Sequence, residues 1–419
     1  MESQLKALGI WASPGFRAYI NSTAFTGMGI AMQQLLVSWI LIGVLHLTAD
    51  RVGLLQALMG LPGIFIMLWG GASADRSDPK IILLRCYTFA PLLPLFLIAI
   101  DQTVSLSVWP VALWGLGMSV MMSFSSPAQQ AILNRVSGNN IQQAVTIATA
   151  AGFVVQITGL MLAGQMETIG LPLVLLIQAM CFGLGVLAVR KIESAPVNPN
   201  PTKESSWTTI IAGLKAIYEH KVIYHVLGIN FISSIFNAGA FITVFPFIIK
   251  RIYEGDALLL AAMMAVFYAG ATASNLLMYK FMPLIRPGRL FLLMQLSRMV
   301  ILYLLWIEPD WWLLIVATVA WGVNMGFTTT MARTIVQESA DKAFLGRIMS
   351  VFTLGMMGSA PIGAVVLGYI IEIFGTLNAL LPAIAVSLAL CICGIAFTGI
   401  WQYVSPTKET AEQKIEGNK

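Results

Sequence analysis

The sequence predicts an all-α integral membrane protein, with twelve transmembrane helices in two pseudo-symmetric six-helix bundles. Composition is the first reason, because 58% of the 419 residues are hydrophobic and 10% are charged, whereas a soluble domain carries about 25% charged residues. Apolar runs are the second reason, because stretches of about 18 residues, enough to cross a bilayer as a helix, recur along the chain. The third reason is that Lys and Arg concentrate on alternate loops.

The apolar runs, bounded by charged residues or by Pro and Gly, define the expected spans. Helices are expected because the runs are too long for barrel strands, and because backbone groups in lipid must be paired within their own segment. The twelve spans cover residues 18–46, 52–74, 81–100, 107–130, 141–165, 169–189, 223–249, 257–279, 289–307, 311–331, 348–371 and 377–403.

Positive charge sets the expected orientation, since loops rich in Lys and Arg stay in the cytoplasm. Twenty of the 24 Lys and Arg residues fall on alternate loops assigned to the cytoplasm. The opposite side carries Arg51, Lys250 and Arg251, and Arg298 falls within a span. This separation predicts an even number of crossings, with both termini in the cytoplasm.

A polar segment with Pro196, Pro199 and Pro201 divides the spans into two groups of six. Within it, apolar residues from Trp207 to Ile217 recur at helical spacing, which predicts a short helix on the cytoplasmic surface. The expected domains are an N-terminal bundle, a cytoplasmic linker with this helix, a C-terminal bundle and a disordered cytoplasmic tail, at residues 1–190, 191–222, 223–404 and 405–419.

Two short motifs indicate that the two groups of spans are homologous. Residues 114–118 read Trp-Gly-Leu-Gly-Met, and residues 321–325 read Trp-Gly-Val-Asn-Met. The motifs lie 207 positions apart, each in the fourth span of its half. Paired halves with a site at their interface are a transporter architecture.

The loop after the second span carries a motif with the spacing G-x-x-x-D-R-x-x-x-K. Its residues are Gly71, Asp75, Arg76 and Lys80. Here the sequence resembles the major facilitator superfamily, whose pattern is G-x-x-x-D-R-x-G-R-[KR]. Positions 78 and 79, Asp and Pro, depart from that pattern, and the Asp is similar to the macrolide-efflux and enterobactin (siderophore) exporter branch.

Other motifs extend this resemblance over residues 16–400. They include the Leu-Pro pair at residues 61–62, Ser-Pro-Ala at residues 126–128 and Gly-Arg-Ile-Met-Ser at residues 346–350. The resemblance implies the major facilitator fold. It also implies a conformational gate that latches the outward-facing state, formed by Gly71, Asp75, Arg76, Lys80, Gly346 and Arg347.

The gate also has a physical basis in the charges of the Asp75 loop. A carboxylate at the cytoplasmic end of a helix can pair with basic groups or with a neighbouring helix N-terminus. A contact made in one conformation and broken in another sets the populations of the two states. The alternative is that Asp75, Arg76 and Lys80 only orient the protein in the membrane.

Uncharged polar residues form stripes on spans one, seven and ten, which line the cavity in the family that the sequence resembles. On span seven, Asn230, Ser234 and Asn237 share one helical face. The full set of candidate cavity residues is Ser22, Thr26, Gln33, Asn230, Ser234, Asn237, Asn324 and Thr328. The alternative is that these groups only form hydrogen bonds between helices.

Arg298 is the charge nearest the middle of a span, and every Asp and Glu lies in a loop, in a tail or near a span end. A central carboxylate is the ordinary proton carrier or cation counter-ion, so lipophilic cations are disfavoured as cargo. One hypothesis is that Arg298 attracts an anionic group. In the family that the sequence resembles, span nine is a supporting helix away from the cavity, so the alternative is that Arg298 bonds backbone carbonyls or Gln295, or extends towards the cytoplasm.

Small residues in spans five and eleven are expected to let helices pack closely. They are Gly159, Gly164, Pro361 and Gly363. The antiporter motif of the family has Gly-Pro-x-x-x-Gly in span five, whereas residues 159–164 of this chain lack the proline. Close packing and an antiport function therefore both remain open for span five.

Together these features predict a secondary active transporter of a bacterial inner (cell) membrane, which exports a small amphiphilic or anionic compound by alternating access. The cargo classes are siderophore-like metabolites and hydrophobic drugs, and protons are the expected coupling ion. A lysophospholipid or metabolite facilitator is the alternative within transport; a receptor, scaffold or enzyme is the disfavoured alternative of another class. We expect a monomer in the lipid bilayer, with no cofactor, no metal site and no nucleic-acid partner.

Overall fold

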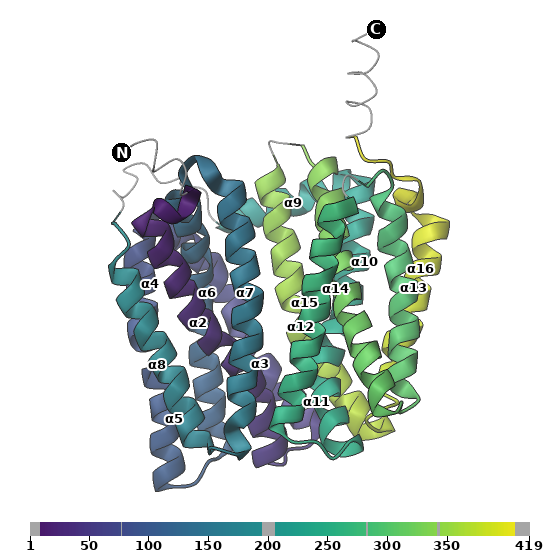
Figure 1. Ribbon diagram of the computed structural model, residues 1–419. Helices are drawn as coiled ribbons and strands as arrows, with labels where there is room; N and C mark the ends of the chain where they lie inside the picture. Colours follow the sequence, from purple (N-terminus) through teal and green to yellow (C-terminus); the bar gives the residue numbers. More distant parts are fainter. Residues whose placement is uncertain (1–8, 77, 195–205, 282–283, 342–343, 407–419) are drawn as a thin grey trace. The chain divides into compact units, whose positions relative to one another are not determined.

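The computed structural model describes residues 9–76, 78–194, 206–281, 284–341 and 344–406. All regular structure in these residues is helical (Figure 1). Twelve of the described helices are long and apolar enough to cross a membrane. This number confirms the twelve spans expected from the sequence.

Most helix bounds lie within a few residues of the expected spans, although the helices of the fourth and tenth spans run past residues 130 and 331 to Ser137 and Ser339. In the first half they are α2 (Pro14–Trp39), α3 (Ala49–Arg76), α4 (Pro79–Phe89), α5 (Leu92–Thr103), α6 (Val108–Ser137), α7 (Ile141–Gly164) and α8 (Leu171–Arg190). In the second half they are α9 (Ser206–Glu219), α10 (Lys221–Gly239), α11 (Phe245–Phe247), α12 (Ala257–Phe281), α13 (Pro287–Trp306), α14 (Trp311–Ser339), α15 (Leu345–Phe374) and α16 (Leu380–Phe397).

Short turns of other helix types join or extend these helices. The π-helical turns are Ile40–Val44, Ala240–Val244 and Ile248–Ile252. The 3-10 turns are Gly9–Ala12, Gly138–Asn140, Gln165–Glu167 and Gly399–Gln402. The α9 helix is the short helix expected within the 191–222 segment, although residues 195–205 lie outside the described part of the chain.

The chain divides into two compact units. The first unit comprises Met1–Thr48, Leu55–Ser206 and Tyr253–Ala265. The second unit comprises Ala49–Leu54, Trp207–Ile252 and Val266–Lys419. Two helices are therefore shared, because the first residues of α3 belong to the second unit and those of α12 belong to the first.

Both units use the same packing scheme. In the first unit, α2 packs against α6, α7 and α8, while α4 and α5 pack against α6 and α8. In the second unit, α10 packs against α14, α15 and α16, while α13 packs against α14 and α16. When the spans are matched in chain order, α2 corresponds to α10, and α4 with α5 corresponds to α13. The same pairs of spans are then in contact in both units, which confirms the pseudo-symmetric bundles that the sequence predicts.

Unusual backbone conformations recur at matching places in the two halves. His46 (φ 49°) follows the first span of the first half, and Glu254 (φ 50°) follows the first span of the second. Gly170 (φ 87°) and Gly375 (φ 91°) follow the fifth span of each half. A π-helical turn also ends the first span of each half. These pairs extend the repeat well beyond the Trp-Gly motif.

The glycine of the repeated Trp-Gly motif marks a close helix crossing in each unit. Both tryptophans of the motif are fully buried. A Cβ on Gly115 would overlap Met59 of α3, and a Cβ on Gly322 would overlap the backbone oxygen of Phe267 of α12. At Gly322 the two backbones come together, whereas Gly115 makes room for the Met59 side chain.

The third span differs from the continuous helix that the sequence suggests. It consists of α4 and α5, which are separated at Ala90 and Pro91. Proline has no N–H for the helical ladder, and its ring crowds the preceding turn. The span is therefore interrupted in its middle.

The last span ends earlier than expected, and the tail begins later. The α16 helix ends at Phe397, whereas the apolar run continues to residue 403. Ser405, expected to be disordered, is 3% exposed; its N–H donates to the Ile285 oxygen (3.0 Å) and its hydroxyl donates to Glu338 (2.8 Å). Burial raises the pKa of the neighbouring Tyr403, which also donates to Glu338. Residues 407–419 lie outside the described part.

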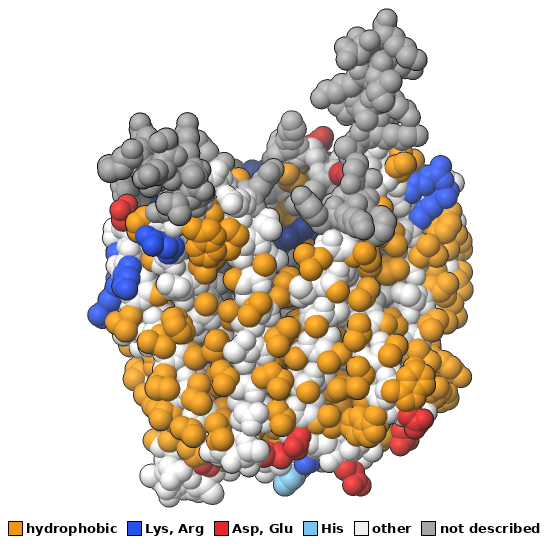
Figure 2. Space-filling view, viewed as in Figure 1, with side chains coloured by type: hydrophobic (Ala, Val, Ile, Leu, Met, Phe, Trp, Pro, Cys, Tyr) orange, Lys and Arg blue, Asp and Glu red, His pale blue; other side chains and the backbone are white. Residues whose placement is uncertain are grey.

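Large apolar side chains are exposed along the helices of both units. Phe89 is 66% and Val154 66% exposed in the first unit, and Leu276 is 71% and Ile373 71% exposed in the second. Figure 2 shows hydrophobic side chains spread over the visible helices rather than gathered in one patch. A surface of this kind suits lipid, which solvates apolar groups that water does not.

Candidate functional site

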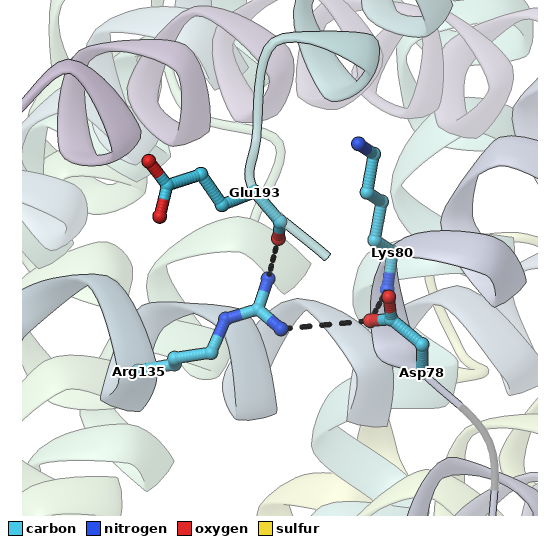
Figure 3. A network of polar contacts seen from close by, with 4 residues as sticks. All are labelled: Asp78, Lys80, Arg135 and Glu193. Carbon is cyan, nitrogen blue, oxygen red and sulfur yellow. Dashed lines mark hydrogen bonds and ion pairs between the residues drawn. The ribbon is translucent and has the colours of Figure 1, made fainter. Parts of the chain in front are cut away.

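A polar network joins three segments of the first unit (Figure 3). Asp78 is 3% exposed and caps α4, because its carboxylate accepts the backbone N–H of Lys80 at 3.0 Å. Arg135, near the end of α6, approaches the same carboxylate oxygen at 3.5 Å and donates to the backbone oxygen of Glu193 at 2.7 Å. One arginine thus connects the loop before α4 with the chain that follows α8.

The structure describes the side chains of only some of the gate residues expected from the sequence. The side chains of Gly71, Asp75 and Arg76 lie outside the described part of the structure. Lys80 contributes its backbone N–H to Asp78, while its ammonium group points away from that carboxylate in Figure 3. Among the described side chains of this loop, Asp78 is therefore the one that forms an ion pair.

The expected gate residues of the second unit lie at the start of α15. A Cβ on Gly346 would meet nothing within 4 Å, so packing does not demand a glycine there. The Arg347 guanidinium lies 5.8 Å from the ring centre of Phe344. A Cβ on Gly213 would lie 2.7 Å from the backbone oxygen of Arg347, so α9 and α15 are in close contact at this glycine.

Arg298 lies at the centre of a polar cluster in the second unit. It is 3% exposed, which excludes an extension towards the cytoplasm. Its Nε donates to Asn324 and its Nη2 to Thr328, each at 3.1 Å, and its Nη1 donates to Ser233 and, at 3.1 Å, to Gln295. The bond to Gln295 agrees with one alternative from the sequence. Among the described residues, no carboxylate lies within ion-pair distance of Arg298.

The polar stripe of span seven is bonded to neighbouring helices. Asn230 donates to the Met356 sulfur at 2.9 Å, and Ser234 donates to the same sulfur at 3.5 Å. Asn237 accepts the indole N–H of Trp321 at 2.7 Å. These hydrogen bonds link span seven to neighbouring helices. That the same residues also line a substrate cavity stays a proposal.

The candidate residues of span one are also held within their own unit. Ser22 and Thr26 are buried, and the Thr26 hydroxyl donates to the Ser22 backbone oxygen at 2.8 Å. Gln33 accepts a hydrogen bond from Gln178 of α8 at 2.9 Å. Its own amide nitrogen, and the amide oxygen of Gln178, are buried without a partner.

The glycines selected for packing lie at helix crossings. A Cβ on Gly159 would lie 2.6 Å from the Met28 backbone oxygen, and one on Gly164 would lie 2.6 Å from the Ala261 Cβ. A Cβ on Gly363 would overlap the Ile235 backbone oxygen. Pro361 is buried within the same helix, α15.

Acidic side chains lie near the ends of the described spans. Glu167, after α7, accepts the indole N–H of Trp39 at 2.7 Å. Glu372, in the last turns of α15, accepts the backbone N–H of Ala49 at 3.2 Å. The latter carboxylate faces the N-terminus of α3, where the helix dipole favours a negative charge.

Several residues of these networks were not predicted as site residues. Arg135 counted only as a loop charge, and Asp78 only as a departure from a family pattern. The place of Asp78 immediately before Pro79 is the signal that could have identified it as a helix cap. Ser233 continues the stripe of span seven at i+3 from Asn230, so its place on that face was also readable.

Comparison with known proteins gives a consistent family. The sequence model of the transmembrane secretion effector family matches residues 8–413. The enterobactin exporter EntS of Escherichia coli O127:H6 (strain E2348/69 / EPEC) is 25% identical over 371 residues, which cover 85% of each chain. EntS of Escherichia coli O1:K1 / APEC is 26% identical over 329 residues, which cover 76% of each chain.

Solved structures share the fold at lower identity. The nucleoside transporter NupG aligns with a TM-score of 0.72 at 16% identity, covering 93% of this chain and 99% of its own. A POT family transporter in complex with 5-aminolevulinic acid aligns with a TM-score of 0.72 at 11% identity, covering 92% of this chain and 96% of its own.

Proposed function

The chain belongs to the transmembrane secretion effector family of the major facilitator superfamily, and from this premise we propose that it exports a small amphiphilic or anionic compound. Membership makes it a multi-pass membrane transporter of small molecules and not an enzyme. The relatives named as enterobactin exporters support a siderophore-like metabolite as the first candidate cargo. Hydrophobic drugs are the second.

The observation that carries the cargo class is the charge inside the second unit. Arg298 is buried with neutral partners only, so its positive charge is not cancelled nearby. A buried and unpaired cation repels cationic cargo and attracts anions, because the low dielectric of the interior weakens screening. Its place within the Pro287–Trp306 span supports an anionic or neutral cargo over a lipophilic cation.

We propose alternating access as the mechanism and the proton gradient as the driving force. The repeated bundles support alternating access, because transporters built from repeats move one half against the other around a site between them. No residue is assigned to carry the proton. Glu167 and Glu372 are two of the described carboxylates near span ends that accept hydrogen bonds from another helix.

Flux in proteoliposomes tests this function. We expect enterobactin to be transported by the purified protein, with a rate that falls at least threefold when a protonophore removes an imposed pH gradient. Empty liposomes and protein-free extracts serve as controls. Transport that requires ATP, or no flux of enterobactin or of any hydrophobic drug that binds, would contradict the proposal.

The gate is tested through Asp75. We expect Asp75→Asn to lower transport about tenfold with little change in yield or unfolding temperature, because the substitution removes a charge and keeps the size of the side chain. Asp101→Asn, at the end of α5, is a matched control that should transport normally. Transport at the wild-type rate in Asp75→Asn would leave only an orienting role for the loop charges.

We further propose that the protein lies in a bacterial inner membrane as a monomer with both termini in the cytoplasm. The distribution of Lys and Arg supports this orientation. A fluorescent protein fused after Lys419 should fluoresce in cells, since green fluorescent protein matures in the cytoplasm. A dark fusion of normal abundance would contradict the orientation.

A further inference from the structure

The polar cluster around Arg298 contains more hydrogen-bond donors than acceptors. A guanidinium carries five N–H groups. Four are used, by Asn324, Ser233, Gln295 and Thr328, which leaves one N–H of Nη2. The acceptors are hydroxyl and amide oxygens, so none of them neutralises the positive charge.

Gln295, which accepts a hydrogen bond from Arg298, adds two further donors to the cluster. The side chain is fully buried, and its Nε2 has no hydrogen-bond partner. Its Oε1 accepts from Arg298 at 3.1 Å and from Ser233 at 2.9 Å. Turning the amide round would place its N–H groups against the guanidinium, so this orientation is the one that the neighbours require. The unpaired group is therefore a donor.

The remaining polar groups of the cluster do not supply the missing acceptor. The Asn324 amide nitrogen donates to the Met294 backbone oxygen at 2.6 Å and to Ser297 at 2.7 Å. The Thr328 hydroxyl donates to the Asn324 backbone oxygen at 2.7 Å. An unpaired donor and an uncompensated cation in the interior are both costly, and an anion would satisfy both.

The first unit shows that this charge is not demanded by the fold. At the position 207 residues before Ser233, α2 carries Thr26. The span that matches α13 carries Pro91 at the position 207 residues before Arg298, and its neutral Tyr87 accepts a hydrogen bond from Gln129 of α6. A bundle of the same plan is thus held together there without a cation.

We propose that Arg298 and Gln295 form a binding site for a monovalent anionic group, between α10, α13 and α14. The group is either a free halide or an acidic group of the cargo, and only the second source rests on the proposed export function. Ser233, Asn324 and Thr328 hold the guanidinium in place, and the N–H groups of Gln295 Nε2 and Arg298 Nη2 receive the anion.

The site is tested by unfolding the full-length protein in detergent, in sodium chloride and in sodium gluconate of equal ionic strength. Gluconate carries a bulky six-carbon chain, so a cluster whose residues are at most 4% exposed should admit chloride in preference to it. A ligand that binds only the folded state stabilises it. We expect chloride to raise the unfolding temperature of the wild type by about 2–4 °C relative to gluconate. No difference between the two salts would overturn the proposal.

Two variants at one position locate the effect. Gln295→Glu has nearly the same shape and places a carboxylate beside Arg298, so we expect it to be at least as stable as the wild type in gluconate and to lose the chloride response. Gln295→Met removes the donors and should weaken the response. Gln178→Met, which alters a buried glutamine of the first unit that donates to Gly29 and Gln33, should keep it. A full chloride response in Gln295→Glu would refute the assignment.

The source of the anion is decided by transport. If an acidic group of enterobactin occupies the site, chloride should raise the KM of wild-type export several-fold, and Gln295→Glu, whose own carboxylate fills the site, should raise the KM several-fold without chloride. An unchanged KM together with the chloride-dependent unfolding shift assigns the site to a free halide. Absence of enterobactin flux with an intact unfolding shift would remove the proposed cargo and leave the anion site standing.

Discussion

Replacing Gly363 by alanine should destabilise the protein by about 3 kcal/mol, at the upper end for an overpacked interior. The added methyl group would overlap the Ile235 backbone oxygen and lie 2.9 Å from the Gly239 Cα. These neighbours are backbone atoms of α10, so neither can rotate away as a side chain would. The two helices must separate, and the contact along their length weakens.

The same helix provides a control of opposite sign. A Cβ on Gly358 would meet nothing within 4 Å, so Gly358→Ala should stabilise α15 by up to about 1 kcal/mol through helix propensity. Gly159→Ala, at the matching crossing of the first unit, should change the stability by an amount between these two, because the Cβ would lie 2.6 Å from the Met28 oxygen. Unfolding temperatures in detergent measure all three. Equal effects of the changes at Gly363 and Gly358 would mean that the crossing can adjust.

Removing the carboxylate of Asp78 should also have a large effect, lowering both the stability of the protein and its export activity. Asp78→Ala loses the cap of α4, which is worth about 1 kcal/mol, and leaves Arg135 without its ionic partner. Because the Arg135 side chain is 29% exposed, solvent screens the pair, and we expect it to add up to about 1 kcal/mol. Export should fall about tenfold, because the network holds the end of the loop that carries the proposed gate.

Asparagine separates the two contributions at this position. Asn is as good a cap as Asp, so Asp78→Asn should keep the stability due to the cap and lose only the pair with Arg135. In a double-mutant cycle with Arg135→Gln, we expect a coupling of about 0.5–1 kcal/mol in unfolding free energy. Additive effects would show that the 3.5 Å contact between the two side chains contributes nothing to stability.

The fold was readable from the sequence because its main determinant is local. A helix in lipid pairs its backbone groups within its own residues, so length and hydrophobicity suffice to find it. Where the expected spans differ from the structure, local chemistry explains the difference. Pro91 interrupts the third span, and the Gly399–Gln402 turn ends the last span early.

The functional groups were only partly readable. The stripe of Asn230, Ser234 and Asn237 follows from helical spacing, which predicts a common face but no partner. The partners, Met356 and Trp321, come from helices far along the chain. The gate charges at Asp75 and Arg76 remain predictions, because their side chains lie outside the described residues.

By itself, then, the sequence determined the membrane class, the number of spans, the repeat and the presence of a mid-span cation. Only the tertiary structure decided that Arg298 is bonded to neutral groups of α10 and α14 beside an unpaired Gln295 nitrogen, and that Asp78 faces Arg135. The physical reason is that hydropathy and charge act residue by residue, whereas a hydrogen bond or an ion pair requires two groups that folding brings together.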